Sequence, residues 1–166
     1  MIKSEYKLLI KAEKITAIIT DLDGTLWHGV VAEKQEPTIN IDYFDFLKKL
    51  YKKGIQLFVV SKNDELEILK TFKELNIDKE IFTYVISNWD PKYLNIERLI
   101  QQTNIRAETT VFIDDNPFEI KETQIKIPQL HCLNFSDWRI LEKNLYLSEK
   151  EMQQESEIKD RINRYR

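Results

Sequence analysis

Short apolar runs that alternate with amphipathic stretches are the feature that most constrains how this chain can fold. The apolar runs are rich in β-branched residues and nearly continuous, as strands buried on both faces are, and they occupy residues 15–20, 55–60, 81–87, 109–113 and 130–133. The stretches between the runs carry apolar residues at helical spacing. Strands that alternate with helices predict a parallel sheet covered on both faces, and hence a Rossmann-like three-layer α/β sandwich.

Capping residues and apolar spacing predict where the helices begin and which faces they bury. Asp90-Pro91 and Asn116-Pro117 each place an N-cap residue before a proline, which is typical of a helix start. A helix that begins at Asp42 is predicted to bury Phe44, Leu47, Leu50 and Tyr51. A second helix, capped by Asn63 or Asp64, is predicted to bury Leu66, Leu69, Phe72 and Leu75.

The length of 166 residues predicts a single domain, with residues 1–146 as its core. Residues 136–145 are predicted to be helical, and a capping box of Ser148 and Glu151 predicts a further, polar helix. We expect residues 147–166 to form a helix that either packs on the core or docks a partner.

Charge and cysteine content narrow the partners and the compartment. The net charge of −3 argues against nucleic acid as the main partner, because proteins that bind the phosphate backbone carry a basic excess. Cys132 is the only cysteine, so no internal disulfide can form. The N-terminus is too charged for a signal peptide, and no apolar run approaches the roughly 20 residues that span a bilayer. We therefore expect a cytoplasmic protein without a membrane partner, and the oligomeric state stays open.

Polar residues follow each of the first four predicted strands. The segments are Asp21-Leu22-Asp23-Gly24-Thr25, Ser61-Lys62-Asn63, Asn88-Trp89-Asp90-Pro91-Lys92 and Asp114-Asp115-Asn116-Pro117. In parallel sheets of this kind, ligands bind just beyond the carboxyl ends of the strands. We therefore expect these segments to converge on one rim and to form the functional site.

The carboxylates on this rim indicate a metal. Asp21, Asp23, Asp114 and Asp115 would repel one another at close range, and a divalent cation removes that conflict. Ligand sets made of oxygen alone favour a hard cation, and partial coordination suits Mg²⁺. A carboxylate such as Asp21 can then attack phosphorus and form an aspartyl-phosphate, while Asp23 protonates the leaving group and later deprotonates the attacking water.

Lys92 and Ser61 fit the same chemistry. Lys92 lies in the first turn of a predicted helix, where the macrodipole disfavours a cation unless an anion is shared between the lysine and the helix N-terminus. The Ser61 hydroxyl can donate to a phosphate oxygen, and we assign the neighbouring Leu22 and Asn63 to the same phosphate-binding role.

Each of these residues also has a plain structural interpretation. An isolated Asp-x-Asp or Asp-Asp is commonly turn chemistry, a single lysine is commonly a surface residue, and Ser61 alone would be a turn or cap residue. Their occurrence together, in this order and each just past a strand, is what favours catalysis.

This combination resembles the four-part signature of the haloacid dehalogenase (HAD) phosphatase superfamily, over residues 15–128. More narrowly, Asp-Leu-Asp-Gly-Thr-Leu-Trp, Val-Ser-Lys-Asn-Asp, Asn-Trp-Asp-Pro-Lys and Phe-Ile-Asp-Asp-Asn-Pro-Phe-Glu resemble subfamily IIIC, the FkbH-like group. Position 24 is glycine where many members of the group carry asparagine, and either residue fits a turn with unusual backbone angles.

The resemblance implies a HAD fold, a Mg²⁺ cofactor and a role for each residue. Asp21 would be nucleophile and metal ligand, and Asp23 would be the general acid/base and give its backbone carbonyl to the metal. Ser61 and Lys92 would hold the phosphoryl group. Asp114 would be the third protein ligand of the metal. The supporting residues would be Thr25, Asp115 and Asn116.

The spacing of the motifs leaves no room for a large cap domain. Only a small flap fits between Asp23 and Asp42, and a helix and a strand use up the residues between Ser61 and Lys92. Trp27 and His28 lie in the flap and are candidate substrate contacts, although His28 is equally well explained as a plain exposed residue.

Several functions are compatible with the resemblance. FkbH-like proteins take a glyceryl unit from 1,3-bisphosphoglycerate, release phosphate and load an acyl carrier protein. Longer members of the group carry additional sequence on both sides of the HAD core, and Cys132 matches no acyl-transfer motif and is also explained as a buried strand cysteine. A stand-alone phosphatase that acts on another phosphorylated small molecule or a phosphoprotein is the alternative.

Two other classes are weighed against catalysis. A receiver-type phospho-accepting domain places its acidic pair after the first strand and the accepting aspartate later, which is opposite to the arrangement here. A non-catalytic binding module would be expected to lack some of the matched residues, and this chain has them all.

Overall fold

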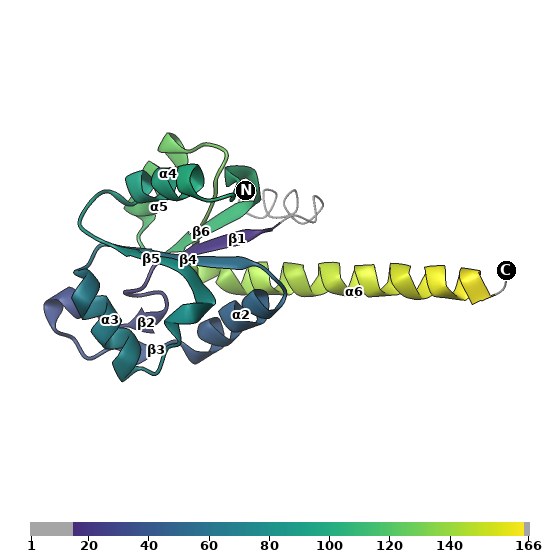
Figure 1. The fold of residues 1–166 in the computed structure, drawn as a ribbon, viewed down its shortest axis with the longest axis horizontal. Helices are drawn as coiled ribbons and strands as arrows, with labels where there is room; N and C mark the ends of the chain where they lie inside the picture. Colours follow the sequence, from purple (N-terminus) through teal and green to yellow (C-terminus); the bar gives the residue numbers. More distant parts are fainter. Residues whose placement is uncertain (1–14, 165–166) are drawn as a thin grey trace. The chain divides into compact units, whose positions relative to one another are not determined.

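The computed structural model describes residues 15–164, with the side chains of residues 146–156 excepted (Figure 1). The chain divides into two compact units. Ile15–Trp138 form the first, and the residues from Arg139 onward belong to the second. All of the strands among the described residues lie in the first unit.

The first unit is built on a parallel sheet with the strand order β5-β4-β1-β6-β7. The strands are β1 (Ala17–Thr20), β4 (Gln56–Ser61), β5 (Phe82–Ser87), β6 (Thr110–Asp114) and β7 (His131–Asn134). The sheet confirms the predicted Rossmann-like α/β fold, and the predicted strands differ from the observed ones by one or two residues at their ends. The central position of β1 explains its continuous apolar run, because every residue of this strand is buried.

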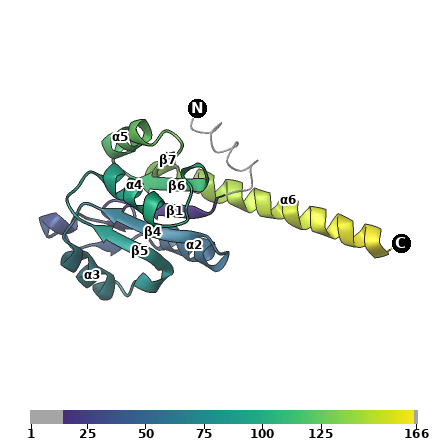
Figure 2. The same cartoon turned by 45° about the horizontal axis from the view of Figure 1, so that its top comes forward.

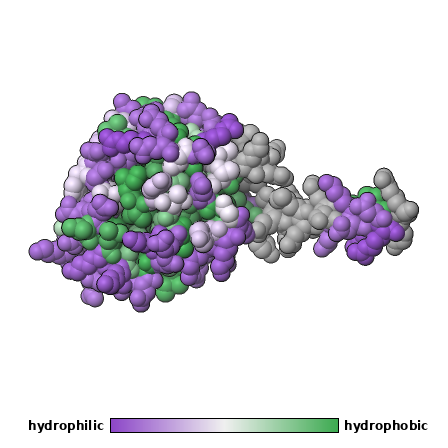
Figure 3. All heavy atoms as spheres, in the orientation of Figure 1, coloured by the Kyte–Doolittle hydropathy of each residue, from purple (hydrophilic) through white to green (hydrophobic). Residues whose placement is uncertain are grey.

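Helices cover both faces of this sheet (Figure 2). One layer holds α4 (Lys92–Gln102) and α5 (Pro117–Lys126), and the other holds α2 (Ile41–Lys52) and α3 (Glu65–Glu74). The core under α4 and α5 includes Ile19, Phe58 and Phe112, which are partners in neighbouring strands. Figure 3 shows hydrophilic side chains over the outside of both helical layers and hydrophobic side chains between them.

Two of the predicted helix faces are corrected by the structure. Helix α2 buries Tyr43 and Phe46 together with Leu47 and Leu50, whereas Tyr51 is exposed. Helix α3 buries Ile68, Thr71 and Phe72, whereas Leu66 is 81% exposed. Both helices carry apolar residues on two adjacent faces, and only the packing against the sheet selects one of them.

An aromatic cluster explains the choice made by α2. The rings of Phe135 and Trp138 contact Tyr43 edge-on, with centroids 4.9 and 5.4 Å away. The Tyr43 hydroxyl lies 2.7 Å from Thr20 Oγ1, at the end of β1. Turning α2 to bury Phe44 and Tyr51 would break these contacts.

The two helix starts marked by proline behave differently. Asn116 caps α5 as predicted, and its side chain accepts a hydrogen bond from the backbone N–H of Phe118. Helix α4 begins one residue later than expected, with Pro91 instead of Asp90 as its N-cap, so that Lys92 is its first residue.

The flap between Asp23 and α2 is a small hairpin. Its strands, β2 (Trp27–His28) and β3 (Thr38–Ile39), pair antiparallel, and a 3₁₀ helix, Val31–Glu33, lies between them. No cap domain is present among residues 15–164, as the motif spacing predicted.

The C-terminal part of the described chain is one continuous helix, α6 (Trp138–Arg164). The predicted helix break at Ser148 is wrong, because Ser148 and Glu151 both lie inside α6.

No helix among the described residues is long and apolar enough to cross a membrane. Cys132 is buried in β7 within the core, as the interpretation as a strand cysteine predicts.

Two leucine substitutions test the helix faces. We expect Leu47→Ala, in a fully buried position, to lower the free energy of unfolding by about 2–5 kcal/mol, because it removes apolar contacts and leaves a cavity. Leu66→Ala should change it by less than about 0.5 kcal/mol, because Leu66 is exposed. Urea unfolding monitored by circular dichroism measures both, and similar losses in the two variants would contradict this description of the core.

Candidate active site

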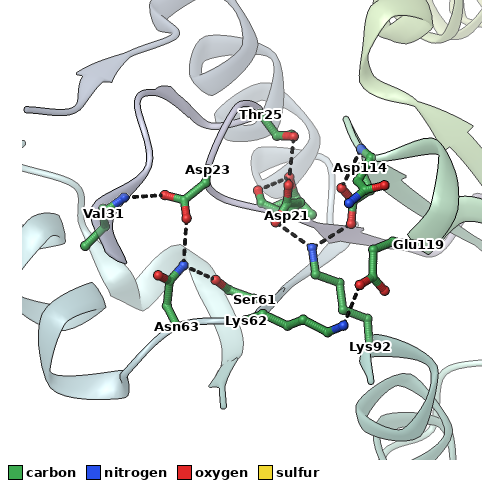
Figure 4. Close-up of polar contacts among 12 residues, drawn as sticks. Asp21, Asp23, Thr25, Val31, Ser61, Lys62, Asn63, Lys92, Asp114 and Glu119 are labelled. Carbon is green, nitrogen blue, oxygen red and sulfur yellow. Dashed lines mark hydrogen bonds and ion pairs between the residues drawn. The ribbon is translucent and has the colours of Figure 1, made fainter. Parts of the chain in front are cut away.

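Four segments at the carboxyl ends of the strands form one cavity of about 300 Å³, as the sequence predicted. Asp21 directly follows β1, Ser61 ends β4, Lys92 begins α4 after β5, and Asp114 ends β6. The cavity is lined by these four residues together with Asp23, Gly24, Gly29, Val30, Gln35, Lys62, Asn63, Asp115, Asn116 and Glu119. Figure 4 shows the polar contacts among the main members of this set.

Lys92 holds the centre of the cavity. Its Nζ donates to Asp21 Oδ1 at 2.8 Å and to Asp114 Oδ2 at 2.6 Å, and all three side chains are almost completely buried. Burial of a charged group is costly unless the group is paired and hydrogen-bonded. The lysine at the start of α4 is therefore explained by the two carboxylates that it faces.

Burial and mutual repulsion shift the protonation of these groups. Burial raises the pKa of Asp21 from 3.8 to about 6, although Lys92 opposes the shift. Burial, together with repulsion from Asp21, raises the pKa of Asp114 to about 7. Burial alone would lower the pKa of Lys92, but its two carboxylate partners outweigh burial and raise that pKa above its ordinary value.

Two threonines fix Asp21. Thr25 Oγ1 donates to Asp21 Oδ2 at 3.2 Å, which agrees with the supporting role that the resemblance implies for Thr25. Thr20 Oγ1 donates to the Asp21 backbone carbonyl at 2.9 Å and also contacts the Tyr43 hydroxyl. The carboxylate of Asp21 is therefore held from the turn that follows it, and its backbone carbonyl is held from the strand that precedes it.

Glycine at position 24 has two structural reasons. Its φ of +72° lies in the left-handed region, as the turn chemistry predicted. In addition, a Cβ at this position would overlap the side chain of Asp115. A larger residue at position 24 would therefore require the Asp115 carboxylate to move.

The acidic cluster fits a hard divalent cation. Asp21, Asp114 and Asp115 each offer a carboxylate oxygen, and these atoms lie within 4.8 Å of one another. Oxygen-only donors of this kind suit Mg²⁺. The third carboxylate of this group comes from Asp115. The side chain of Asp23 is not part of the group, so only the backbone carbonyl of Asp23 is left for the metal contact expected of this residue.

Asp23 is held by three N–H donors. Its Oδ1 accepts from Trp27 Nε1 at 2.8 Å. The same oxygen accepts from the Val31 backbone N–H at 3.1 Å, and Oδ2 accepts from Asn63 Nδ2 at 2.9 Å (Figure 4). Two of these donors belong to the flap and the third follows β4. The flap therefore positions the candidate acid/base.

The predicted substrate contact of Trp27 is wrong, because its ring is fully buried. The ring packs edge-on against Phe72, with centroids 5.9 Å apart, and its N–H serves Asp23 instead. His28 is exposed and does not line the cavity. The Leu22 side chain is also fully buried, so only the backbone of this residue is left for a phosphate.

Asn116 caps α5, and its backbone N–H donates to Asp114 Oδ1 at 3.0 Å.

An ion pair beside the cavity was missed by the sequence analysis. Lys62 Nζ lies 2.6 Å from Glu119 Oε1, and the Glu119 side chain is only 6% exposed. Both residues lie inside the quoted motifs, directly after Ser61 and in the first turn after Asn116-Pro117. The only sign in the sequence that these two residues belong to the site is their position next to strand ends. The spacing of charges along the chain does not show that β4 and α5 bring the two side chains together.

The chain is similar to a known family over residues 30–126, more than half of its length. This segment matches the model of the haloacid dehalogenase-like hydrolases. The chain belongs to the haloacid dehalogenase-like hydrolase family. The match begins after Asp21 and Asp23, which the geometry places in the same cavity as the Lys92 and Asp114 of the matched segment.

Solved structures of the family have the same fold. The N-terminal part of a Bacteroides fragilis protein, containing a phosphatase domain complexed with Mg, is 25% identical and covers 86% of this chain with a TM-score of 0.70. This chain spans 43% of that chain. The cobalt-bound deoxy-D-mannose-octulosonate 8-phosphate phosphatase from Haemophilus influenzae is 22% identical, with a TM-score of 0.53 over 68% of this chain and 65% of that one. No curated protein matches the sequence.

The raised pKa values of Asp21 and Asp114 predict a pH-dependent effect of metal. Because both are raised above their unfolded value of 3.8, the metal-free fold gains stability from their protons at low pH and loses it as the pH rises through 6 and 7. Mg²⁺ competes with these protons, so its binding should strengthen over the same range.

Thermal unfolding with and without Mg²⁺ at about pH 5 and about pH 8 tests this linkage. At about 100 times its Kd at the higher pH, Mg²⁺ should stabilise the fold by about 2.7 kcal/mol, and the same concentration should stabilise it much less at the lower pH. Protein treated with EDTA is the metal-free reference, and an equal effect of Mg²⁺ at both pH values would contradict the assignment.

Proposed function

We propose that this chain is a Mg²⁺-dependent phosphohydrolase or phosphotransferase that acts through an aspartyl-phosphate on Asp21. The observation that carries the proposal is the buried Lys92, which bridges Asp21 and Asp114 in a cavity that also contains Ser61 and Asp115. Carboxylates and a lysine arranged in this way can bind a phosphoryl group and a cation together.

In the first half of the reaction, an Asp21 carboxylate oxygen attacks the phosphorus atom. The new bond joins that oxygen to phosphorus, and the bond between phosphorus and the leaving-group oxygen breaks. Lys92 neutralises charge on the phosphoryl oxygens, and Ser61 donates a hydrogen bond to one of them. Asp23 supplies a proton when the leaving group needs one.

In the second half, water attacks the phosphorus of the aspartyl-phosphate. Asp23 accepts the proton of the water, and the bond between phosphorus and Asp21 breaks, which releases inorganic phosphate and restores the carboxylate. Mg²⁺, held by Asp21, Asp114 and the other oxygen donors of the acidic cluster, would lower the repulsion between the carboxylates and the phosphoryl oxygens. The Bacteroides fragilis structure, whose phosphatase domain is complexed with Mg, supports this choice of metal.

Loss of the nucleophile tests the proposed reaction. Asp21→Asn should lower Mg²⁺-dependent phosphate release by a factor on the order of 10³ or more, because the amide cannot form the phosphoenzyme. A phosphate-release assay with p-nitrophenyl phosphate and 1,3-bisphosphoglycerate measures this. Asp45→Asn, at a half-exposed position on α2, is the matched control and should leave the rate unchanged. Equal turnover by wild type and Asp21→Asn would contradict the nucleophile.

At a finer level, we propose that the chain is FkbH-like and that its substrate is an acyl phosphate such as 1,3-bisphosphoglycerate. The resemblance of the four quoted motifs supports this. For loading, the thiol of the acceptor must attack the carbonyl carbon of the acyl phosphate and displace inorganic phosphate, because attack by Asp21 on that phosphorus would release a carboxylate that cannot form a thioester. Asp21 then removes the remaining ester phosphate, and Asp23 gives the leaving oxygen its proton.

An acyl carrier protein is the proposed acceptor in this finer scheme, and a stand-alone phosphatase is the alternative. No described feature of the chain supplies an acceptor thiol, because Cys132 is buried in β7. The single cysteine also supports a reducing compartment such as the cytoplasm as the place of action.

Acyl loading distinguishes the two schemes. Mass spectrometry of an acyl carrier protein incubated with the chain and 1,3-bisphosphoglycerate should show the mass of one glyceryl unit. Hydrolysis of phosphate esters without loading would favour the stand-alone phosphatase.

A further inference from the structure

Asn63 lies between two groups of the proposed reaction. Its side chain follows β4 and is buried, with 2% of the residue exposed. Nδ2 lies 2.8 Å from Ser61 Oγ and 2.9 Å from Asp23 Oδ2 (Figure 4). Asn63 was predicted to contact phosphate, but its amide instead bonds to Ser61 and Asp23.

The orientation of the amide follows from Asp23. A carboxylate only accepts hydrogen bonds, so the NH₂ group of Asn63, and not its carbonyl oxygen, must face Asp23. One N–H of this group reaches Asp23 and the other reaches Ser61. Both amide protons are therefore engaged within the protein.

The direction of the Asn63–Ser61 hydrogen bond determines where the serine proton can go. The amide nitrogen cannot accept, so Ser61 Oγ must be the acceptor in this contact. The hydroxyl keeps its own proton for another acceptor. Ser61 lines the cavity together with Asp21 and Lys92. Phosphoryl oxygens are acceptors, so a phosphoryl group in this cavity meets Ser61 as a donor.

The backbone around Asn63 is tied to the end of β5. Ser87 Oγ donates to the Asn63 carbonyl at 2.7 Å, and the Asn88 N–H donates to the Ser61 carbonyl at 3.2 Å. These bonds hold the amide in place from the neighbouring strand. The placement of Asn63 is therefore set by the sheet and does not depend on a ligand.

We propose that Asn63 is a positioning residue that directs the Ser61 hydroxyl proton toward the phosphoryl group while it anchors Asp23. This inference rests on the proposed function, because it assumes that Ser61 contacts the phosphoryl group. Asn63 acts through Ser61 and does not touch phosphate with its side chain.

A double-mutant cycle of Ser61→Ala and Asn63→Ala tests the proposal. The probe is inorganic phosphate, whose affinity for the Mg²⁺-loaded protein is measured by titration calorimetry. Each single variant should weaken phosphate binding about tenfold, as loss of one hydrogen bond to a charged group does. The double variant should bind about as weakly as either single variant, because the same interaction is lost in all three. Multiplicative losses, or unchanged binding by Asn63→Ala, would overturn the proposal.

A matched control and a second variant separate this role from general loss of structure. Asn95→Ala removes another buried asparagine, which bonds to Asn88 and Arg98 outside the cavity. It should lower the Tm without changing phosphate affinity. If Asn63→Ala does not fold, Asn63→Asp keeps the shape, and its carboxylate accepts the Ser61 proton. Asn63→Asp is expected to lower the phosphate affinity more in the wild-type background than in the Ser61→Ala background. Equal losses of affinity in the two backgrounds would overturn the proposal.

The cycle does not require turnover, so it separates the inference from the proposed function. Coupling in phosphate binding without hydrolysis of any substrate would support the role of Asn63 and count against the enzyme activity. Turnover without coupling would overturn only the role of Asn63. Absence of both phosphate binding and turnover in the Mg²⁺-loaded wild type would overturn both.

Discussion

The buried contacts of Lys92 with Asp21 and Asp114 are the interaction on which the rest of the site depends. Three ionisable side chains are almost completely buried side by side, and this arrangement is stable only when each charge has a partner at hydrogen-bond distance. The partners come from β1, β6 and the first turn of α4, so the contacts form only once the sheet has assembled. The cavity has more carboxylates than ammonium groups, and this excess of negative charge is what a divalent cation can balance.

The hydrogen bonds around the carboxylates explain how the site keeps its shape. Asp21 is held by the two threonines that flank it, and Asp23 is held by the flap on one side and by Asn63 on the other. Each carboxylate is thus fixed by more than one element of the fold. Catalysis of phosphoryl transfer depends mainly on position and charge, so a rigid frame of this kind contributes directly to the chemistry.

The family and the finer proposal rest on different observations. Family membership and the HAD chemistry depend on strand ends that any member must bring together. The cavity is also lined by Lys62, Glu119 and the flap residues Val30 and Gln35. The lining residues are predominantly polar, which fits a small phosphorylated metabolite better than an extended apolar one. The FkbH-like proposal rests on the four quoted motifs, whereas family membership rests on the match over residues 30–126.

The sequence by itself determined the strands, their parallel arrangement and the meeting of Asp21, Ser61, Lys92 and Asp114. Buried strands are marked by continuous apolar runs, and the ends of parallel strands must share one edge, so local patterns suffice for these features. Only the tertiary structure decided which faces α2 and α3 bury, that α6 continues through Ser148, and that Trp27 supports Asp23 instead of reaching a substrate. The same holds for the Lys62–Glu119 pair and for the amide of Asn63 between Ser61 and Asp23. Contacts between residues far apart in the chain decide the buried helix faces, the packing of Trp27 against Phe72, the Lys62–Glu119 pair and the bond from Asn63 to Asp23. Such contacts leave no periodic signal in the sequence around either partner.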